Sequence, residues 1–375
     1  MLFVGELFLI VGVFSPVINW CGGAELVAVN IINTLKENGH QVILLSNKSL
    51  NQTKLKKVFG ENVIVDQQIV FPLRFFSPTN YHNIYTDALR SIMLKLKCEI
   101  VIDVYSNAIL PGVDTCYIHY PLLTGVKDSL PYLRNKIYFS PYQSFLHSNR
   151  KNIDKKLIFA NSGFTAKAIK TEFGINPHVL YPPISNSLLD HNKKVIVGPR
   201  ETKVITVARI SEGKNLDIIP YIAQSTRKEI SFTIVGLLDS IKVLNSLKSL
   251  IKKLNVSYKV KILTNISRDQ LRSLFLNSRV YLHPTINEHF GISIVESMAS
   301  GCIPVVHDSG GPREFVSQAF RYNNVEEAAK KVEKAVSYWS PLRAREMTKY
   351  ADRFSGKNFS KHFIELFNSH LNRDI

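Results

Sequence analysis

Residues 281–316 read YLHPTINEHFGISIVESMASGCIPVVHDSGGPREFV, and this organising stretch decides how the second half of the chain folds. Its apolar residues and turn residues predict, in order, a strand, a loop, a helix, a second strand, a second loop and a further helix. Gly291 gives the backbone freedom just before the first helix, and Gly301 is placed to end it. Strands that alternate with helices in this way are typical of the α/β class.

Two carboxylates, Glu288 and Glu296, bracket the first junction of loop and helix and lie eight residues apart. From this spacing alone, a polar loop residue and an exposed helical residue are as good an interpretation as a binding site. Residues 288–296, EHFGISIVE, nevertheless resemble the E-x7-E signature of the retaining nucleotide-sugar glycosyltransferases of family 4. The segments EHFGI and HDSGGP are similar to the GDP-mannose-dependent mannosyltransferases of lipid-linked glycan assembly.

This resemblance implies an α/β protein of GT-B architecture, in which two Rossmann-like domains face each other across a cleft. The length of 375 residues suits two domains of ordinary size. We expect an N-terminal, acceptor-side domain over residues 1–183, closed by Pro182 and Pro183 after a strand. A nucleotide-sugar-binding domain over residues 184–350 would follow. A final helix in residues 351–375 would cross back to pack on the first domain.

The net charge of +17 and the isoelectric point near 9.6 concern the partners of the protein more than its fold. They allow an anionic membrane surface, an anionic substrate or nucleic acid. Because the sequence carries no recognised nucleic-acid motif, a basic nucleic-acid-binding protein with a Rossmann-like body is the less favoured hypothesis, and we expect no nucleic acid partner. The cysteines are scattered without metal-site spacing and fit reduced thiols of a cytosolic protein: Cys21, Cys98, Cys116 and Cys302.

The apolar start of the chain is interpreted as a buried strand. Residues 1–14, MLFVGELFLIVGVF, lack a basic leading segment and include Glu6. This run is also shorter than the roughly 20 apolar residues that a membrane-spanning helix needs. We therefore expect a first strand over Leu7 to Phe14, and residues 1–6 are consistent with an extension from an early start codon.

Two features of the first domain are candidate site residues. Gly22 and Gly23 lie between a strand and a helix, where open parallel sheets bind ligands, although a tight turn explains them equally well. The dinucleotide pattern G-x-G-x-x-G is absent. His119 follows an apolar strand in the context IHYP, a position at which a histidine is more often structural. The resemblance implies that the glycines lie near the donor phosphates and the acceptor, and that His119 reaches the donor sugar.

Arg209 and Lys214 lie in a loop after a strand of the second domain. Two solvated cations are the ordinary interpretation of such residues. Their R-x4-K spacing is similar to the pair with which family 4 enzymes grip the donor diphosphate. The resemblance therefore implies that these side chains, and not a divalent metal, stabilise the leaving group. The sequence offers no D-x-D carboxylate pair placed for a metal, and we expect neither a metal site nor a cofactor.

The resemblance also assigns the residues of the organising stretch. Glu288 would contact hydroxyls of the donor sugar, and Glu296 the two hydroxyls of the nucleotide ribose. Phe290, Gly291 and Ile292 would belong to the donor site, where backbone N–H groups at the start of the helix contact anions or hydroxyls. Together with His119, Arg209 and Lys214, Glu288 forms the expected catalytic set.

The segment from Lys127 to Lys156 mixes aromatic with basic side chains. This composition suits a membrane interface, and an ordinary amphipathic helix pair that covers the sheet explains it equally well. Peripheral binding to the cytosolic face of a membrane is the first interpretation, and it places the protein in the cytoplasm.

The favoured hypothesis is thus a retaining glycosyltransferase that moves a hexose, mannose from GDP-mannose, to a glycan or lipid-linked acceptor in an α-linkage. The alternative is a family 4 glycosyltransferase with a UDP-sugar donor and a soluble acceptor. The sequence by itself names neither the acceptor nor the linkage position nor the oligomeric state.

Overall fold

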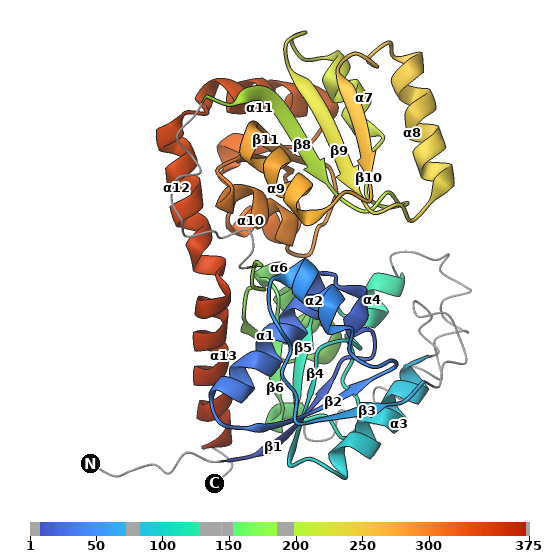
Figure 1. The fold of residues 1–375 in the computed structure, drawn as a ribbon, viewed down its shortest axis with the longest axis vertical. Coiled ribbons are helices and arrows are strands. Elements are labelled where there is room, and N and C mark those ends of the chain that lie inside the picture. The colour runs from blue at the N-terminus through green and yellow to red at the C-terminus, as the bar shows by residue number, and fades with distance from the viewer. Residues whose placement is uncertain (1–7, 73–82, 128–143, 145–152, 186–198, 373–375) are drawn as a thin grey trace. The chain divides into compact units, whose positions relative to one another are not determined.

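The computed structural model describes residues 8–72, 83–127, 144, 153–185 and 199–372. The chain divides into two compact units. Unit 1 comprises Met1–Pro183 and Gly356–Ile375, and unit 2 comprises Ile184–Ser355. Each unit contains a parallel β-sheet with helices, and each is described by itself (Figure 1).

Unit 1 has a seven-stranded sheet in the order β3-β2-β1-β4-β5-β6-β7 within its described residues, and every neighbouring pair is parallel. Its strands are β1 Ile10–Phe14, β2 Gln41–Ser46, β3 Gln67–Val70, β4 Ile100–Asp103, β5 Thr115–Ile118, β6 Leu157–Ala160 and β7 His178–Val179. Its longer helices are α1 Gly23–Glu37, α2 Gln52–Phe59, α3 Asn83–Lys95, α4 Leu122–Lys127, α6 Gly163–Phe173 and α13 Gly356–Leu371.

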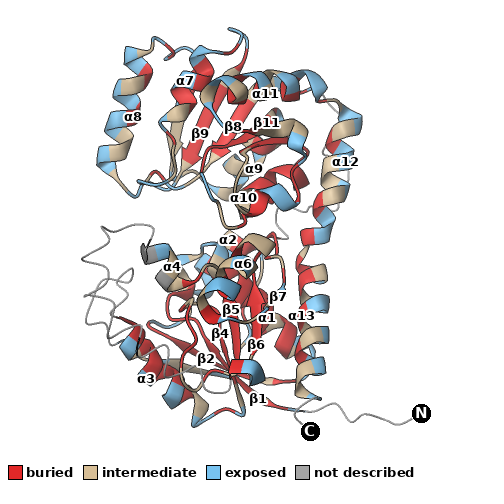
Figure 2. Ribbon diagram, turned by 180° about the vertical axis from the view of Figure 1, so that it is seen from behind, coloured by how far each residue is buried: buried red, intermediate tan, exposed pale blue. Residues whose placement is uncertain are grey.

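Both faces of this sheet are buried, as the alternation of side chains along β2 illustrates. Val42 and Leu44 lie in the core that α1 and α13 cover, whereas Ile43 and Leu45 lie in the core that α3 and α6 cover. Successive side chains of a strand point to opposite faces, so a strand that is apolar at every position must be covered on both sides. Figure 2 shows these central strands in the buried class.

The last helix of the chain belongs to unit 1. Phe359, Phe363 and Phe367 of α13 are spaced by four residues, so they share one face of the helix, and all three are buried. Their rings follow one another with centroids 6.3 and 5.6 Å apart. The hydroxyl groups of Thr34 on α1 and Ser360 on α13 are 2.6 Å apart. The predicted return of the final helix to the first domain is confirmed.

Unit 2 has a six-stranded parallel sheet in the order β10-β9-β8-β11-β12-β13 within its described residues. Its strands are β8 Glu201–Val207, β9 Ser231–Gly236, β10 Val260–Thr264, β11 Ser278–His283, β12 Ile303–His307 and β13 Arg321–Tyr322. Its longer helices are α7 Ile218–Gln224, α8 Ile241–Lys253, α9 Arg268–Asn277, α10 Ile292–Ala299, α11 Val325–Tyr338 and α12 Pro341–Ala351.

The strand order of each sheet reverses once, between β1 and β4 in unit 1 and between β8 and β11 in unit 2. Open parallel sheets bind ligands beyond the carboxyl ends of the strands at such a reversal, because the two connecting loops diverge there. The loop after β8 carries Arg209 and Lys214, and the loop after β11 carries Glu288. The order of the strands thus places these loops at the reversal.

The organising stretch folds as predicted through its second strand, whereas the further helix is only the short 3-10 helix Gly311–Glu314. β11, α10 and β12 follow one another, and α10 ends just before Gly301, whose φ of +81° favours glycine. Several elements were not predicted, among them α2, β3, α3, α7 and α12. The first strand begins at Ile10; residues 1–7 lie outside the described residues. Most of the aromatic and basic segment 127–156 also lies outside them.

No helix within the described residues combines the length and the apolar character that crossing a membrane requires.

Candidate active site

The loops after β8 and β11 meet at an ion pair. The ammonium group of Lys214 lies 3.2 Å from Oε2 of Glu288. The next residue, Asn215, adopts a φ of +52° and donates its side-chain amide to the carbonyl of Pro284, 3.0 Å away. The two loops are therefore joined by a side-chain ion pair and by a hydrogen bond to backbone.

His283, the last residue of β11, also contacts Glu288. Its Nε2 atom lies 3.1 Å from Oε2, and the backbone N–H of His289 donates to Oε1 of the same carboxylate at 3.1 Å. Burial by itself would raise the pKa of Glu288, but the hydrogen bond and charge of His283, with the charge of Lys214, hold that pKa well below its usual range. Glu288 is thus an ionised carboxylate in a site where its side chain is only 16% exposed.

The backbone of Glu288 is held by the glycine pair that follows β12. The N–H of Gly311 donates to the carbonyl of Glu288 at 2.8 Å. Gly310 has a φ of +69°, and a Cβ atom at this position would lie 2.2 Å from the same carbonyl oxygen. Any side chain would therefore both strain the backbone and displace the loop of Glu288. Ser309 adds a second hydrogen bond to this loop, because its hydroxyl oxygen accepts from the N–H of Asn287 at 2.7 Å.

Glu296 lies on α10 and is paired with a residue that no sequence pattern indicated. A guanidinium nitrogen of Arg268 lies 2.8 Å from its Oε1 atom, and the side chain of Glu296 is only 9% exposed. Arg268 is the first residue of α9, whose N-terminus Ser267 caps. Arg268 and Glu296 are 28 positions apart, and they meet only because α9 packs beside α10. No spacing in the sequence therefore relates the two residues.

The start of α10 requires a glycine. Gly291 precedes the helix with a φ of +87°, and a Cβ atom there would lie 2.5 Å from Cδ1 of Ile294. The side chain of Phe290 is buried, with its ring centroid 5.2 Å from that of Phe315 and 5.6 Å from that of Phe354. Phe290 therefore supports the loop from the core, and only its backbone remains to serve the predicted donor site.

Arg209 and Lys214 have different partners in the structure. Arg209 is 65% exposed, and its guanidinium lies 3.9 Å from the carboxylate of Asp239, at the limit of an ion pair. Lys214 is 26% exposed and pairs with Glu288. Of the two predicted phosphate-binding cations, Lys214 is thus held in the site, and Arg209 extends into solvent beside the loop after β9.

The predicted residues of unit 1 lie at the carboxyl edge of its own sheet. Gly22 is the N-cap of α1, and its N–H donates to the carboxylate of Glu25 at 2.7 Å. Gly23 is the first residue of that helix. His119 follows β5; its Nε2 atom lies 3.3 Å from the carbonyl of Val104, so this nitrogen carries the proton.

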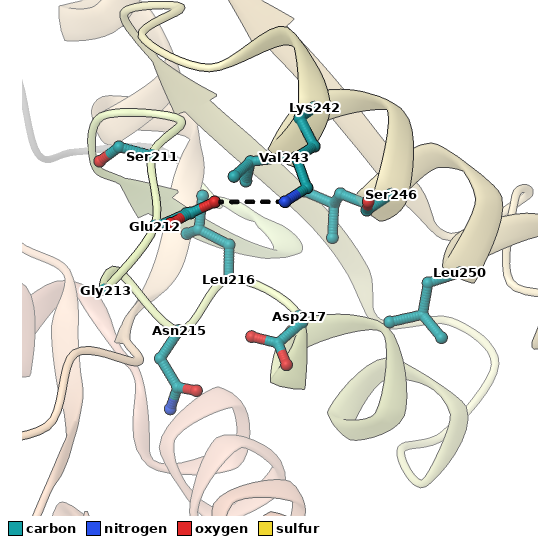
Figure 3. A pocket seen from close by; sticks show the side chains of 11 residues that line it. Ser211, Glu212, Gly213, Asn215, Leu216, Asp217, Lys242, Val243, Ser246 and Leu250 are labelled. Carbon is teal, nitrogen blue, oxygen red and sulfur yellow. Dashed lines mark ion pairs between the residues drawn. The ribbon is translucent and has the colours of Figure 1, made fainter.

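A pocket of about 470 Å³ adjoins the loop that carries Lys214. It lies between that loop and α8, and Glu212 and Lys242 form an exposed ion pair of 3.8 Å across it (Figure 3). None of the predicted site residues lines this pocket. Within the described residues, no group of three His, Cys, Asp or Glu side chains is arranged to hold a metal ion.

Comparison with known families identifies the chain. Residues 21–187 match the family described as Glycosyltransferase Family 4, and residues 190–354 match the family described as Glycosyl transferases group 1. The chain is a glycosyltransferase whose first half matches family 4. The two matches together cover both units, so the glycosyltransferase assignment extends over most of the chain.

Named relatives and solved structures agree with this assignment. The chain is 26% identical over 309 residues to the GDP-Man:Man(3)GlcNAc(2)-PP-Dol alpha-1,2-mannosyltransferase of Dictyostelium discoideum, over 69% of this chain and 60% of that protein. It is 29% identical over 234 residues to the mouse (Mus musculus) protein of the same name, over 52% of this chain and 46% of that protein. The chain therefore spans about half of the length of these relatives.

Similar solved structures show the fold of this glycosyltransferase. A glycosyltransferase of Rickettsia africae ESF-5 superposes with a TM-score of 0.67 at 18% identity, over 97% of this chain and 99% of that chain. Anabaena Alr3699/HepE in complex with UDP-glucose superposes with a TM-score of 0.71 at 17% identity, over 96% and 100%. The predicted GT-B fold is confirmed.

Glu288→Gln should lower the free energy of unfolding at pH 7, because it removes the ionised partner of His283 and Lys214. The pKa of Glu288 is lowered in the folded state, so its ionisation stabilises the fold fully above the unfolded value of about 4.3 and less as the pH falls toward the folded value. Urea unfolding from pH 7 to pH 3 should therefore show a constant difference down to about pH 5, and a shrinking one below about pH 4.

The matched control is Glu346→Gln, which breaks an exposed pair with Arg343. Exposed pairs contribute about 0–1 kcal/mol, so this variant should differ little from the parent at any of these pH values. A difference for Glu288→Gln that grows on acidification would contradict the direction of the pKa shift.

Proposed function

We propose that this glycosyltransferase transfers mannose from GDP-mannose to a lipid-linked glycan, with retention of the anomeric configuration and an α-linked product. The observation that carries the proposal is the pairing of Glu288 with Lys214 at the strand-order reversal of unit 2. It is supported by relatives named as GDP-mannose-dependent alpha-1,2-mannosyltransferases, two of which are 26% and 29% identical.

The proposed roles in unit 2 follow from charge and donor chemistry. Lys214 would contact the donor diphosphate while it keeps its pair with Glu288, because an ammonium group has three N–H donors. Arg209, which is exposed and weakly paired, would turn to the same phosphates. Glu288 would accept hydrogen bonds from sugar hydroxyls. Glu296 would accept from the ribose hydroxyls beside its ion pair with Arg268.

The chemical step demands stabilisation of the leaving diphosphate. As the glycosidic bond breaks, negative charge gathers on the phosphate oxygens and positive charge on the sugar. A preorganised donor aimed at the developing negative charge contributes on the order of 3 kcal/mol at the transition state. Lys214 and the backbone N–H groups at the start of α10, beside Gly291 and Ile292, are the proposed donors of unit 2.

His119, Gly22 and Gly23 are the proposed site residues of unit 1. The imidazole N–H of His119 is directed at the carbonyl of Val104, so contact with a donor sugar would require the ring to exchange that bond or to use its other nitrogen. The N-terminus of α1 is occupied by the carboxylate of Glu25. An anion at this helix end would therefore compete with Glu25 for the N–H of Gly22.

The donor is tested by thermal unfolding of the protein with GDP, UDP and ADP, each with and without its mannose or glucose conjugate. A ligand that binds the folded state raises the melting temperature, and at a given concentration the rise is larger for the ligand that binds more tightly. We expect the largest rise with GDP and GDP-mannose, and transfer of radiolabelled mannose to a lipid-linked acceptor. Preferential stabilisation by UDP or ADP would show the guanine assignment to be wrong.

A UDP-sugar donor with a soluble acceptor is the second candidate function. Its specific support is the similarity of the fold to Anabaena Alr3699/HepE, whose structures contain UDP, glucose and UDP-glucose. The same thermal series distinguishes the two, since each predicts a different base as the stronger ligand.

We propose that transfer needs no divalent metal and no cofactor, because Lys214 and Arg209 supply the positive charge. Activity should persist in excess chelator. Lys214→Ala should lower both the rate and the donor affinity, since the cation contacts the phosphates in the ground state and the transition state alike. Arg209→Lys should restore only part of the activity lost in Arg209→Ala, because a point charge does not reproduce a planar fork.

The matched control for these two variants is Lys242→Ala. Lys242 is 85% exposed and pairs with Glu212 on the far side of the same loop. It should leave donor affinity unchanged. Activity that disappears with chelator and returns with magnesium would refute the metal-free mechanism, and unchanged kinetics in Lys214→Ala would refute the role of that residue.

We further propose a cytoplasmic protein that binds an anionic membrane surface peripherally. The segment 127–156 that motivates this lies largely outside the described residues, but α3 offers a second apolar surface. Its outward stripe is apolar and exposed, and its one acidic residue, Asp87, is buried against Arg90. The stripe consists of Tyr85, Leu89, Ile92 and Met93 of α3 and of Leu96 just after the helix, with exposed fractions of 43%, 54%, 42%, 38% and 83%.

Sedimentation with vesicles that contain anionic lipid tests this proposal. The parent should bind at low salt and less at high salt, because each basic residue near the surface contributes about 1 kcal/mol that salt screens. Leu89→Ser with Leu96→Ser should weaken binding without unfolding the protein, since both side chains are exposed. Equal binding at both salt concentrations, or none at either, would contradict it.

A further inference from the structure

The two oxygen atoms of the Glu288 carboxylate have different numbers of hydrogen-bond partners. Oε2 is contacted by two side-chain donors, Nε2 of His283 at 3.1 Å and Nζ of Lys214 at 3.2 Å. Oε1 is contacted by the backbone N–H of His289 at 3.1 Å. An ionised carboxylate has about four acceptor sites, two on each oxygen. One acceptor site therefore remains, and it is on Oε1.

The protonation of His283 follows from its partner. A carboxylate can only accept a hydrogen bond, so the Nε2 atom of His283 carries a proton. His283 is only 3% exposed, so water cannot substitute for this bond. Lys214 has a different character, since its longer side chain is 26% exposed and has further donors for a ligand. The two contacts to Oε2 thus differ: one is fixed in the core, and the other is available to phosphate.

The imidazole ring of His283 is held from its other edge by Tyr281. The hydroxyl of Tyr281 lies 3.2 Å from Nδ1, and the two rings stack with centroids 6.0 Å apart. Tyr281 is fully buried, and its hydroxyl also meets Oγ of Ser293 at 2.7 Å and the carbonyl of Val207 at 3.2 Å. Strand β8 and helix α10 therefore fix the tyrosine that fixes the histidine.

We propose that His283 is a positioning residue for the donor sugar: together with Lys214 it occupies Oε2 of Glu288, so that Oε1 is presented to a sugar hydroxyl. This inference rests on the proposed function of the same site and assigns the atom that recognises the sugar. Without His283 the carboxylate can rotate toward Lys214 and lose its single orientation. We then expect the affinity for the sugar part of the donor to fall and the affinity for the nucleotide to stay unchanged.

A buried histidine with a merely structural role predicts a different pattern. Its replacement would lower stability and weaken nucleotide and sugar nucleotide together. The measurement that separates the two is therefore the ratio of affinities for GDP-mannose and GDP, determined by calorimetry on the full chain, with kcat and KM measured beside it.

His283→Ala should reduce the affinity for GDP-mannose relative to GDP by about tenfold or more, since a charge-assisted hydrogen bond contributes that order of discrimination. His283→Gln can place an amide N–H near the position of Nε2 and should restore the ratio to within about threefold of the parent. His283→Asn is too short to do so and should resemble the alanine variant. Tyr281→Phe keeps the ring but removes the contact to Nδ1, and it should give an intermediate ratio.

The matched control is His40→Ala, because His40 is buried to a similar degree, at 4% exposure, but lies in unit 1 against Phe367. It should lower the melting temperature without changing the ratio. A parallel loss of both ligands in His283→Ala and His283→Gln would overturn the positioning role, as would an unchanged ratio.

The proposed function is tested separately, by measuring which sugar nucleotide the parent protein binds. If the parent binds UDP-glucose in place of GDP-mannose, the same ratio is measured with UDP-glucose and UDP. The donor assignment is then wrong, and the role of His283 is still decided. If the parent binds no sugar nucleotide, both proposals are wrong.

Discussion

A carboxylate that is largely removed from water must be kept ionised by its surroundings, and Glu288 imposes this constraint on unit 2. Three segments together meet it. The loop after β8 supplies Lys214, the end of β11 supplies His283, and the loop after β12 holds the backbone through Gly311. These strands are neighbours in the order β8-β11-β12. The strand order of the sheet thus brings Lys214 next to the charge of Glu288, although the two residues are 74 positions apart.

Unit 1 shows what happens to a buried carboxylate without such cations. Asp103 ends β4 beside the strand-order reversal of its own sheet, and it is buried with Ser106 and the backbone N–H of Tyr105 as partners. Burial raises its pKa to about 6, although these hydrogen bonds oppose the rise. Neutral donors only moderate the effect of desolvation, whereas a nearby cation reverses it. In two sheets of the same kind, the pKa values of buried carboxylates are therefore shifted in opposite directions.

Features set by local sequence were predictable, and features set by packing were not. The strand, helix and strand of residues 281–316 follow from apolar periodicity and from glycines such as Gly301, both of which act within a few residues. By contrast, β3 reads QQIV, with two polar residues and no alternation that marks a strand, and it forms because β2 offers it a partner. Likewise Arg268 and His283 have no sequence signal, since their contacts with Glu296 and Glu288 appear only when α9, α10 and β11 pack.

The connection from α12 to α13 has a consequence for how the protein is made. Residues of unit 2 are contiguous in the chain, whereas unit 1 is completed only by Gly356–Leu371 at the far end. Domains generally fold as they emerge during synthesis. On the ribosome, the phenylalanines of α13 are therefore missing from the core of unit 1 until all of unit 2 has been translated. Part of the apolar surface of unit 1 stays uncovered during that time, and unit 1 is completed only after unit 2.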